Sequence, residues 1–130
     1  MASIFTKIIN KEIPAYIVAE DDNFIAFLDV FPIKYGHTLV VPKKEVDYIF
    51  DLDADTYTGL MLFTQKVATA VKKAVPCKKV GVAVIGLEVP HTHIHLVPME
   101  AVSDMNFANP KLQFEKEAFE KVCADIKAHL

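Results

Sequence analysis

Apolar residues recur along this chain at two different spacings, which together predict a mixture of helices and strands. The clearest helical spacing runs from about Asp53 to Val75, where apolar side chains step by three and four. Asp53 itself is a suitable N-cap. The same spacing predicts an amphipathic helix over about 114–130, and a short helix over 3–11 with Ser3 as its candidate N-cap.

Shorter runs rich in apolar, β-prone residues lie between these helices. Residues 16–19 and 24–30 flank an acidic turn, a pattern typical of a β-hairpin. Further strands are predicted over 37–41, over 79–86, where the apolar run indicates a buried strand, and over 91–99. The strands bracket one long helix without regular βαβ alternation. We therefore expect an α+β fold with a mostly antiparallel sheet.

Composition narrows the class of protein. The chain has 130 residues, 52% hydrophobic and 24% charged, without repeats or linkers, so we expect one globular domain over 1–130. No apolar run has the length of a membrane span, and the N-terminus lacks the pattern of a secretory signal. Cys77 and Cys123 are isolated, as expected for free thiols in a reducing compartment. These features favour a cytoplasmic protein with no membrane partner.

The charge pattern restricts the ligand. The net charge is −3, and all 14 basic residues are lysines, because the chain contains no arginine. Proteins that recognise a polynucleotide depend on bidentate arginine side chains and on a basic surface. This chain has no arginine and a net negative charge, so a nucleic-acid partner is not expected. A small phosphorylated ligand remains compatible. Its phosphate would be held by histidine, lysine, backbone N–H groups or a metal ion.

Three of the five histidines alternate at His91, His93 and His95. In a strand, residues two apart share a face, so the three rings would line up together while Ile94 and Leu96 face the core. In a helix the same rings would spread over about 200°, at about 100° per residue. The spacing therefore predicts a strand that presents a row of imidazoles.

Two kinds of chemistry suit such a row. A neutral imidazole is a good nucleophile near pH 7, and attack on phosphorus would give a phosphohistidine while neighbouring rings donate N–H groups to the phosphate. His37 offers a fourth imidazole for the same pocket. Alternatively, His-x-His on a strand is a good metal-ligand pair. The residues that could complete such a metal site are His37, Glu88 and Asp29. Residue chemistry leaves both alternatives open.

Residues 91–97, HTHIHLV, resemble the HxHxHxx signature of the histidine triad (HIT) family of nucleotide-binding proteins, most closely in its Hint branch. The resemblance extends over about residues 3–99 in the family's order. It is carried by segments 5–15, 20–30 and 36–44 as well as by the triad. It implies a HIT-like fold with a five-stranded, mostly antiparallel sheet, one long helix and a C-terminal helix.

The resemblance also implies a role for each matching position. His93 matches the family's nucleophile, which becomes nucleotidylated on the α-phosphorus. His95 matches the residue that contacts the phosphate, and His91 and His37 match supporting imidazoles. Asp29 matches the acid that hydrogen-bonds the ribose hydroxyls. The positions that match the lining of the base slot are Ile13, Phe27, Val30 and Leu39.

The activity implied by the resemblance is hydrolysis of a nucleoside 5′-phosphoramidate or a related conjugate, which releases a purine nucleoside monophosphate such as AMP. The family usually forms homodimers, and no cofactor or metal is implied for the reaction. For Phe27 and Val30, plain core packing is the alternative interpretation.

The sequence departs from the family pattern in several places. Many bacterial relatives begin with a CxFC zinc motif, where this chain has Ser3-Ile4-Phe5-Thr6. Leu87 occupies the position of a glutamine, and Met99 stands where arginine is common. Glu88 matches an acid in some relatives and is either a general acid for the leaving group or surface charge. The altered loop keeps open a further alternative, a nucleotide-binding module without catalysis.

Overall fold

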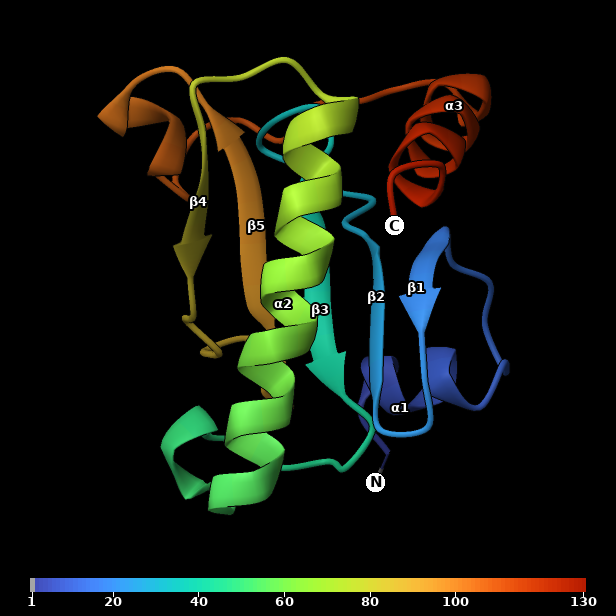
Figure 1. Ribbon diagram of the computed structural model, residues 1–130, viewed down its shortest axis with the longest axis vertical. Helices are drawn as coiled ribbons and strands as arrows, with labels where there is room; N and C mark the ends of the chain where they lie inside the picture. The colour runs from blue at the N-terminus through green and yellow to red at the C-terminus, as the bar shows by residue number, and fades with distance from the viewer. Residues whose placement is uncertain (1) are drawn as a thin grey trace.

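A single antiparallel sheet organises the computed structural model, which describes residues 2–130 (Figure 1). Its five strands lie in the order β1-β2-β3-β5-β4, and every neighbouring pair is antiparallel. The strands are β1 (Ile17–Glu20), β2 (Phe24–Leu28), β3 (Thr38–Pro42), β4 (Lys79–Ala83) and β5 (Ile94–Met99). The predicted α+β class and five-stranded sheet are confirmed.

Three α-helices flank this sheet, and all three were predicted. They are α1 (Ile4–Ile9), α2 (Ala54–Ala74) and α3 (Lys116–Lys127), with short 3₁₀ turns η1 (Ile49–Asp51) and η2 (Val102–Met105). The predicted N-caps are confirmed, because the Ser3 and Asp53 side chains accept hydrogen bonds from the backbone N–H groups of Thr6 and Thr56. Within residues 2–130, no helix combines the length and apolar character needed to cross a bilayer.

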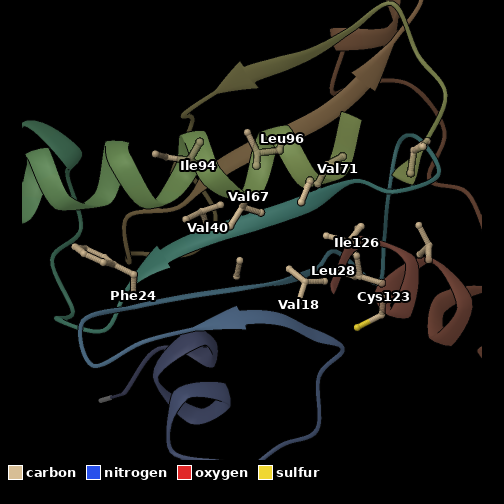
Figure 2. Close-up of a cluster of buried hydrophobic side chains, with 14 of the residues drawn as sticks. Val18, Phe24, Leu28, Val40, Val67, Val71, Ile94, Leu96, Cys123 and Ile126 are labelled. Atoms are coloured by element: carbon tan, nitrogen blue, oxygen red, sulfur yellow. The ribbon is translucent and has the colours of Figure 1, made fainter. Parts of the chain in front are cut away.

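The larger hydrophobic core lies between one face of the sheet and the helices α2 and α3. Figure 2 shows Val40, Ile94 and Leu96 of the sheet packed against Val67 and Val71 of α2. The buried face of α3, which includes the free Cys123, closes the end of this core beside β1. Each such side chain contributes about 1.5–3 kcal/mol through burial.

A second, smaller cluster lies on the opposite face, under α1. Phe5 and Ile8 of α1 cover Phe27 of β2 and Leu39 of β3. Since side chains alternate along a strand, β2 is buried on both faces, and its residues divide between the two clusters. The same alternation in β5 sends Ile94 and Leu96 toward α2 and turns His95 to the opposite face of the sheet.

Strand β4 differs from its prediction. The apolar run 79–86 was expected to be a buried strand, but β4 ends at Ala83 and forms an edge of the sheet. The Val82 side chain is 54% exposed, and Ile85 is also exposed. A continuous apolar run predicts burial on both faces only if other elements cover them, and within residues 2–130 nothing pairs with the outer edge of β4.

Candidate functional site

Four imidazoles form one row on the α1 side of the sheet. The ring centroids are 5.2 Å apart for His37 and His95, and 5.0 Å apart for His95 and His93. The Phe5 ring of α1 lies 4.9 Å from His93 and 5.8 Å from His91, which continues the row. All four histidines are buried, with at most 9% of each residue exposed. The structure thus brings together the four residues that the sequence singled out.

The backbone under this row differs from the prediction of a strand over 91–99, because β5 begins only at Ile94. Pairing with β3 ends at Ile94, and pairing with β4 ends at His95, so neither neighbour reaches the two preceding histidines. The loop after β3 replaces the missing strand. Thr92 donates both its backbone N–H and its hydroxyl to the Val46 carbonyl oxygen, each at 2.7 Å.

The His91 ring is hydrogen-bonded at both nitrogens. Its Nε2 lies 2.8 Å from the Pro42 carbonyl oxygen, which can only accept, so the proton is on Nε2. Its Nδ1 therefore accepts from the Ser3 hydroxyl, 2.7 Å away. These two bonds fix the position of the ring, and they leave it no free lone pair.

A polar cluster joins α1 to this ring. The Ser3 backbone N–H and the Thr6 hydroxyl both donate to Glu45 Oε1, at 2.7 and 2.6 Å. These hydrogen bonds, from Thr6 first and then Ser3, lower the pKa of Glu45 to about 2. The two positions that carry cysteines in the CxFC motif are therefore hydroxyl side chains in a hydrogen-bonded cluster. The sequence indicated Ser3 as an N-cap and as a position of the CxFC motif, but not as a partner of His91, and nothing in the sequence pointed to Glu45.

His93 is oriented by the main chain of its neighbour. Its Nδ1 lies 2.7 Å from the His91 carbonyl oxygen and must donate to it. The proton of the neutral ring is thereby held on Nδ1, and the lone pair is on Nε2. A lone pair held in a fixed direction on a buried imidazole is suited to nucleophilic attack.

His37 and His95 form a relay that begins at a backbone amide. The Ile33 N–H donates to His37 Nδ1 at 3.2 Å, so the proton of His37 is on Nε2. His37 Nε2–H then donates to His95 Nδ1 at 2.9 Å. His95 must consequently carry its own proton on Nε2. That N–H is a donor available to an anion.

Burial keeps the rings of His37, His91 and His95 neutral at pH 7. It lowers the pKa of His37 to about 4, with further lowering by the Lys111 ammonium and by His93. It lowers the pKa of His95 to about 3, where His37 and His93 add to the effect and Asp29 opposes it. Burial also lowers the pKa of His91, against the opposing effects of the Pro42 carbonyl and Glu45.

Among the other candidate residues, Asp29 is placed beside the row. Its Oδ2 lies 3.6 Å from His37 Nε2, and its Oδ1 accepts from the Phe31 N–H at 2.8 Å. Val30 follows it on the surface, 47% exposed, so core packing is the wrong interpretation for that residue.

The remaining predicted residues are either packed or exposed. Phe27 and Leu39 are buried in the cluster under α1, with Ile13 at its border, so core packing does describe Phe27. Glu88 and Leu87 are exposed in the loop before the triad. The structure therefore does not bring Glu88 into the row of imidazoles.

A metal-binding arrangement is present by distance alone. Ligand atoms of Asp29, His37 and His95 all lie within 4.8 Å of one another. However, the Ile33 N–H points at His37 Nδ1, and the proton of His37 is then on Nε2, the atom that faces the other two ligands. Because metal ligation needs a free lone pair there, the hydrogen bonds argue against this site. They also argue against His91 as a ligand, since both of its nitrogens are engaged.

The segment after η2 adds residues that the sequence pattern did not indicate. The Phe107 ring packs edge-on against His95 at 4.7 Å and lies 6.0 Å from His37. Lys111 follows four residues later, and its Nζ donates to the Phe107 carbonyl oxygen at 3.2 Å. This segment has neither a helical nor a strand spacing, so no periodic signal marked it.

A groove of about 550 Å³ opens on the other side of His93. Apolar residues from η1, the start of α2 and the end of β4 line it, among them Phe50, Tyr57, Met61 and Val82. Tyr57 and Met61 lie on the apolar stripe of the predicted helix, yet both are more than one-third exposed here. The groove connects the row of imidazoles with the uncovered edge of the sheet.

Comparisons with known proteins identify the family of this chain. Residues 10–102 match the HIT domain. An uncharacterized HIT-like protein of Borreliella burgdorferi is 34% identical over 98% of this chain and 97% of its own length. The adenosine 5′-monophosphoramidase HNT1 of Saccharomyces cerevisiae is 34% identical over 75% of this chain and 62% of its own length.

The fold comparison gives the same result. The crystal structure of a HIT-like protein from Bartonella henselae superposes with a TM-score of 0.85 at 34% identity, covering 98% of this chain and 96% of that one. The match to the HIT domain extends over more than half of the chain. The chain therefore belongs to the HIT family.

Proposed function

We propose that the protein is a nucleotide hydrolase or transferase that acts at the α-phosphorus of nucleoside phosphoramidates or related nucleotide conjugates. The product would be a purine nucleoside monophosphate such as AMP. The observation that carries this proposal is the hydrogen bond from His93 Nδ1 to the His91 carbonyl oxygen, which leaves the Nε2 lone pair free. The similarity to a yeast adenosine 5′-monophosphoramidase supports the same class of substrate.

In the proposed reaction, His93 Nε2 attacks the α-phosphorus, and the bond from phosphorus to the leaving group breaks. The leaving group takes the electron pair and a proton from solvent. The ring becomes positively charged in this step, and the His91 carbonyl oxygen stabilises that charge through Nδ1–H. Water then attacks the phosphorus, the P–Nε2 bond breaks, and the nucleotide leaves while His93 is regenerated.

Other residues would position the substrate. The His95 Nε2–H, held in place by the relay from Ile33 and His37, would donate to a non-bridging phosphate oxygen. Asp29, whose Oδ2 lies 3.6 Å from His37, would accept from the ribose hydroxyls. Ile13, Val30 and Leu39 would contact the base, whereas Phe27 packs in the cluster under α1.

We also propose a homodimer, formed through the outer edge of β4. That edge is unpaired within residues 2–130, and exposed apolar side chains of β4, α2 and η1 surround it. A second copy would satisfy the strand edge, cover the apolar surface and close the groove beside His93. Analytical ultracentrifugation tests this, and a monomer at micromolar concentration would contradict it. The domain extent over 1–130 and the cytoplasmic location stay predictions.

The decisive experiment is detection of the covalent intermediate. Wild-type protein is mixed with adenosine 5′-phosphoramidate, quenched in alkali and examined by intact-mass spectrometry, and an adenylyl adduct is expected. The His93→Ala variant should form no adduct and show no turnover, yet bind AMP within about tenfold of wild type, or about 1.4 kcal/mol. His129→Ala, which removes an exposed histidine near the C-terminus, is the matched control and should behave as wild type.

The same assay separates the alternatives. A non-catalytic nucleotide-binding module would bind AMP without forming an adduct. A metal-dependent enzyme would lose its activity in chelator, whereas the proposed reaction is indifferent to chelation. Full turnover by His93→Ala would end the assignment.

A further inference from the structure

A phosphate at this site would meet very little positive charge. The lowered pKa values of His37, His91 and His95 leave those three rings neutral at pH 7, and the Asp29 carboxyl group lies 3.6 Å from His37 Nε2. The chain has no arginine. A nucleotide phosphate carries at least one negative charge, so its binding in a largely buried site calls for a nearby cation.

The segment 106–112 packs against this site. The Phe107 ring covers His95 and His37 at 4.7 and 6.0 Å. The segment is held at its start by bonds from the Ala108 N–H to Asn106 Oδ1, 2.9 Å, and from Asn109 Nδ2 to the Ser103 carbonyl oxygen, 2.9 Å. These contacts keep it in place before any ligand binds.

The end of the segment is fixed to the loop that carries Asp29. The Leu112 N–H donates to the Pro32 carbonyl oxygen at 2.8 Å. Lys111 is therefore held between this loop and Phe107, whose carbonyl oxygen accepts from Nζ at 3.2 Å. Burial is the main cause of the lowered pKa of His37 and His95, and the Lys111 charge is among the further causes for both. This is expected for an ammonium group near both rings.

Within residues 2–130, Lys111 is also free of a carboxylate partner, unlike Lys34 and Lys43. Lys34 pairs with Asp104 at 3.6 Å, and Lys43 pairs with Glu20 at 2.8 Å. Within residues 2–130, Lys111 forms no ion pair. Its only side-chain bond there, to a carbonyl oxygen, can be exchanged for one to an anion.

We propose that Lys111 binds the phosphate of the nucleotide and supplies the positive charge that the imidazole row lacks. The inference rests on the proposed function, because it assumes a phosphorylated nucleotide at His93 and His95. Lys111 Nζ would exchange the Phe107 carbonyl oxygen for a non-bridging phosphate oxygen, beside the N–H donated by His95. Phe107 would keep water from the same oxygens.

The test compares a charged ligand with its uncharged counterpart. Dissociation constants for AMP and for adenosine are measured by calorimetry with wild type, Lys111→Met, Lys111→Arg and the matched control Lys116→Met, which removes an exposed lysine from the start of α3. Lys111→Met should weaken AMP binding by about tenfold and leave adenosine binding unchanged. Lys111→Arg should keep most of the AMP affinity, and Lys116→Met should match wild type.

The outcomes separate this inference from the proposed function. If Lys111→Met keeps the wild-type preference for AMP over adenosine, or if Lys116→Met loses it equally, the role of Lys111 is wrong while the nucleotide site stands. If wild type does not bind AMP more tightly than adenosine, both proposals fail. Histidine NMR spectra of the unliganded variants check that the imidazole row remains folded.

Discussion

At one end of the imidazole row, His91 is hydrogen-bonded on both nitrogens and lies near the Glu45 carboxylate. At the other end, His37 and His95 bond to each other, and the Lys111 ammonium is among the charges that add to the effect of burial. Burial lowers the pKa of the rings at both ends. At the first end the Glu45 anion opposes this lowering, whereas at the second end the Lys111 cation adds to it at both rings and Asp29 opposes it at His95.

The comparison shows that one residue type can be kept in one tautomer by two different means. At the α1 end, the Pro42 carbonyl oxygen fixes the tautomer of His91. The ring is held further by polar contacts that involve Ser3, Thr6 and Glu45, which a single substitution can remove. The other end depends on burial and on a backbone amide, that of Ile33. The two ends should therefore respond differently to pH and to mutation.

The largest expected effect is a decrease in the free energy of unfolding at acidic pH, caused by the burial of His37 and His95 as neutral rings. Above pH 6.5, the usual pKa of histidine, these rings are neutral in the folded and unfolded states and contribute no pH dependence. As the pH falls from 6.5 toward about 4, the unfolded chain binds protons that the folded protein excludes, so the free energy of unfolding decreases. The slope is about 1.4 kcal/mol per pH unit for each ring.

Urea denaturation at pH 7, 6 and 5 measures this slope. The range lies above the titration of ordinary carboxyl groups, so the imidazoles dominate it. The His37→Phe variant provides the control, because its free energy of unfolding should lack the pH dependence that one ring contributes. A free energy of unfolding that stays constant from pH 6.5 to 5 would contradict the buried, neutral state of these histidines.

The next largest effect should come from breaking the relay. His37→Phe keeps an aromatic ring beside Phe107 but removes the Nε2–H that fixes the His95 tautomer. The His95 proton can then move to Nδ1, and the phosphate loses its donor. We expect kcat to fall by about a hundredfold, comparable to the loss of one oxyanion donor.

Two measurements distinguish this effect from a general loss of structure. The ¹⁵N chemical shifts of His95 should report the changed tautomer in His37→Phe. His37→Gln, which can still donate from its amide, should recover part of the rate. Wild-type kcat in His37→Phe, with the proton still on His95 Nε2, would show that the relay is not needed.

The smallest effect is expected at the α1 end. Ser3→Ala removes both the N-cap of α1 and the hydroxyl donor to His91 Nδ1. We expect kcat to decrease by about tenfold as the His91 ring and its carbonyl oxygen shift, and the free energy of unfolding to decrease by about 1 kcal/mol.

Asp53→Ala is the matched control, since it removes the N-cap of α2. It should decrease the free energy of unfolding by a similar amount to Ser3→Ala, with no change in kcat. Ser3→Thr should restore the rate. Equal kcat values for Ser3→Ala and Asp53→Ala would refute a link between Ser3 and the catalytic row.

The sequence predicted what local signals determine. The periodicity of α2, the caps at Ser3 and Asp53, and the acidic turn before β2 depend on residues close together in the chain, and the structure confirms them. Alternation correctly placed the imidazoles opposite Ile94 and Leu96, although the strand itself begins later than predicted. That boundary depends on where β3 and β4 stop pairing, which is a property of distant segments.

Other features could not be predicted because they depend on long-range contacts. The exposure of Val82 follows from the place of β4 at the sheet edge, which its apolar composition does not reveal. Phe107 and Lys111 reach the site through a segment without periodicity. The tautomers depend on single acceptors and donors, such as the Pro42 carbonyl and the Ile33 amide, that only the folded chain brings to the rings.

The acceptor that orients His93 belongs to the main chain, so it persists whichever amino acid occupies position 91. Replacing the His91 side chain would disturb the surroundings of that oxygen without deleting it. A scan of side-chain substitutions would consequently underestimate how much His93 depends on its neighbour. Chemical synthesis with an ester in place of the 91–92 peptide bond makes this carbonyl a poorer acceptor, and it also removes the Thr92 N–H that donates to the Val46 carbonyl oxygen.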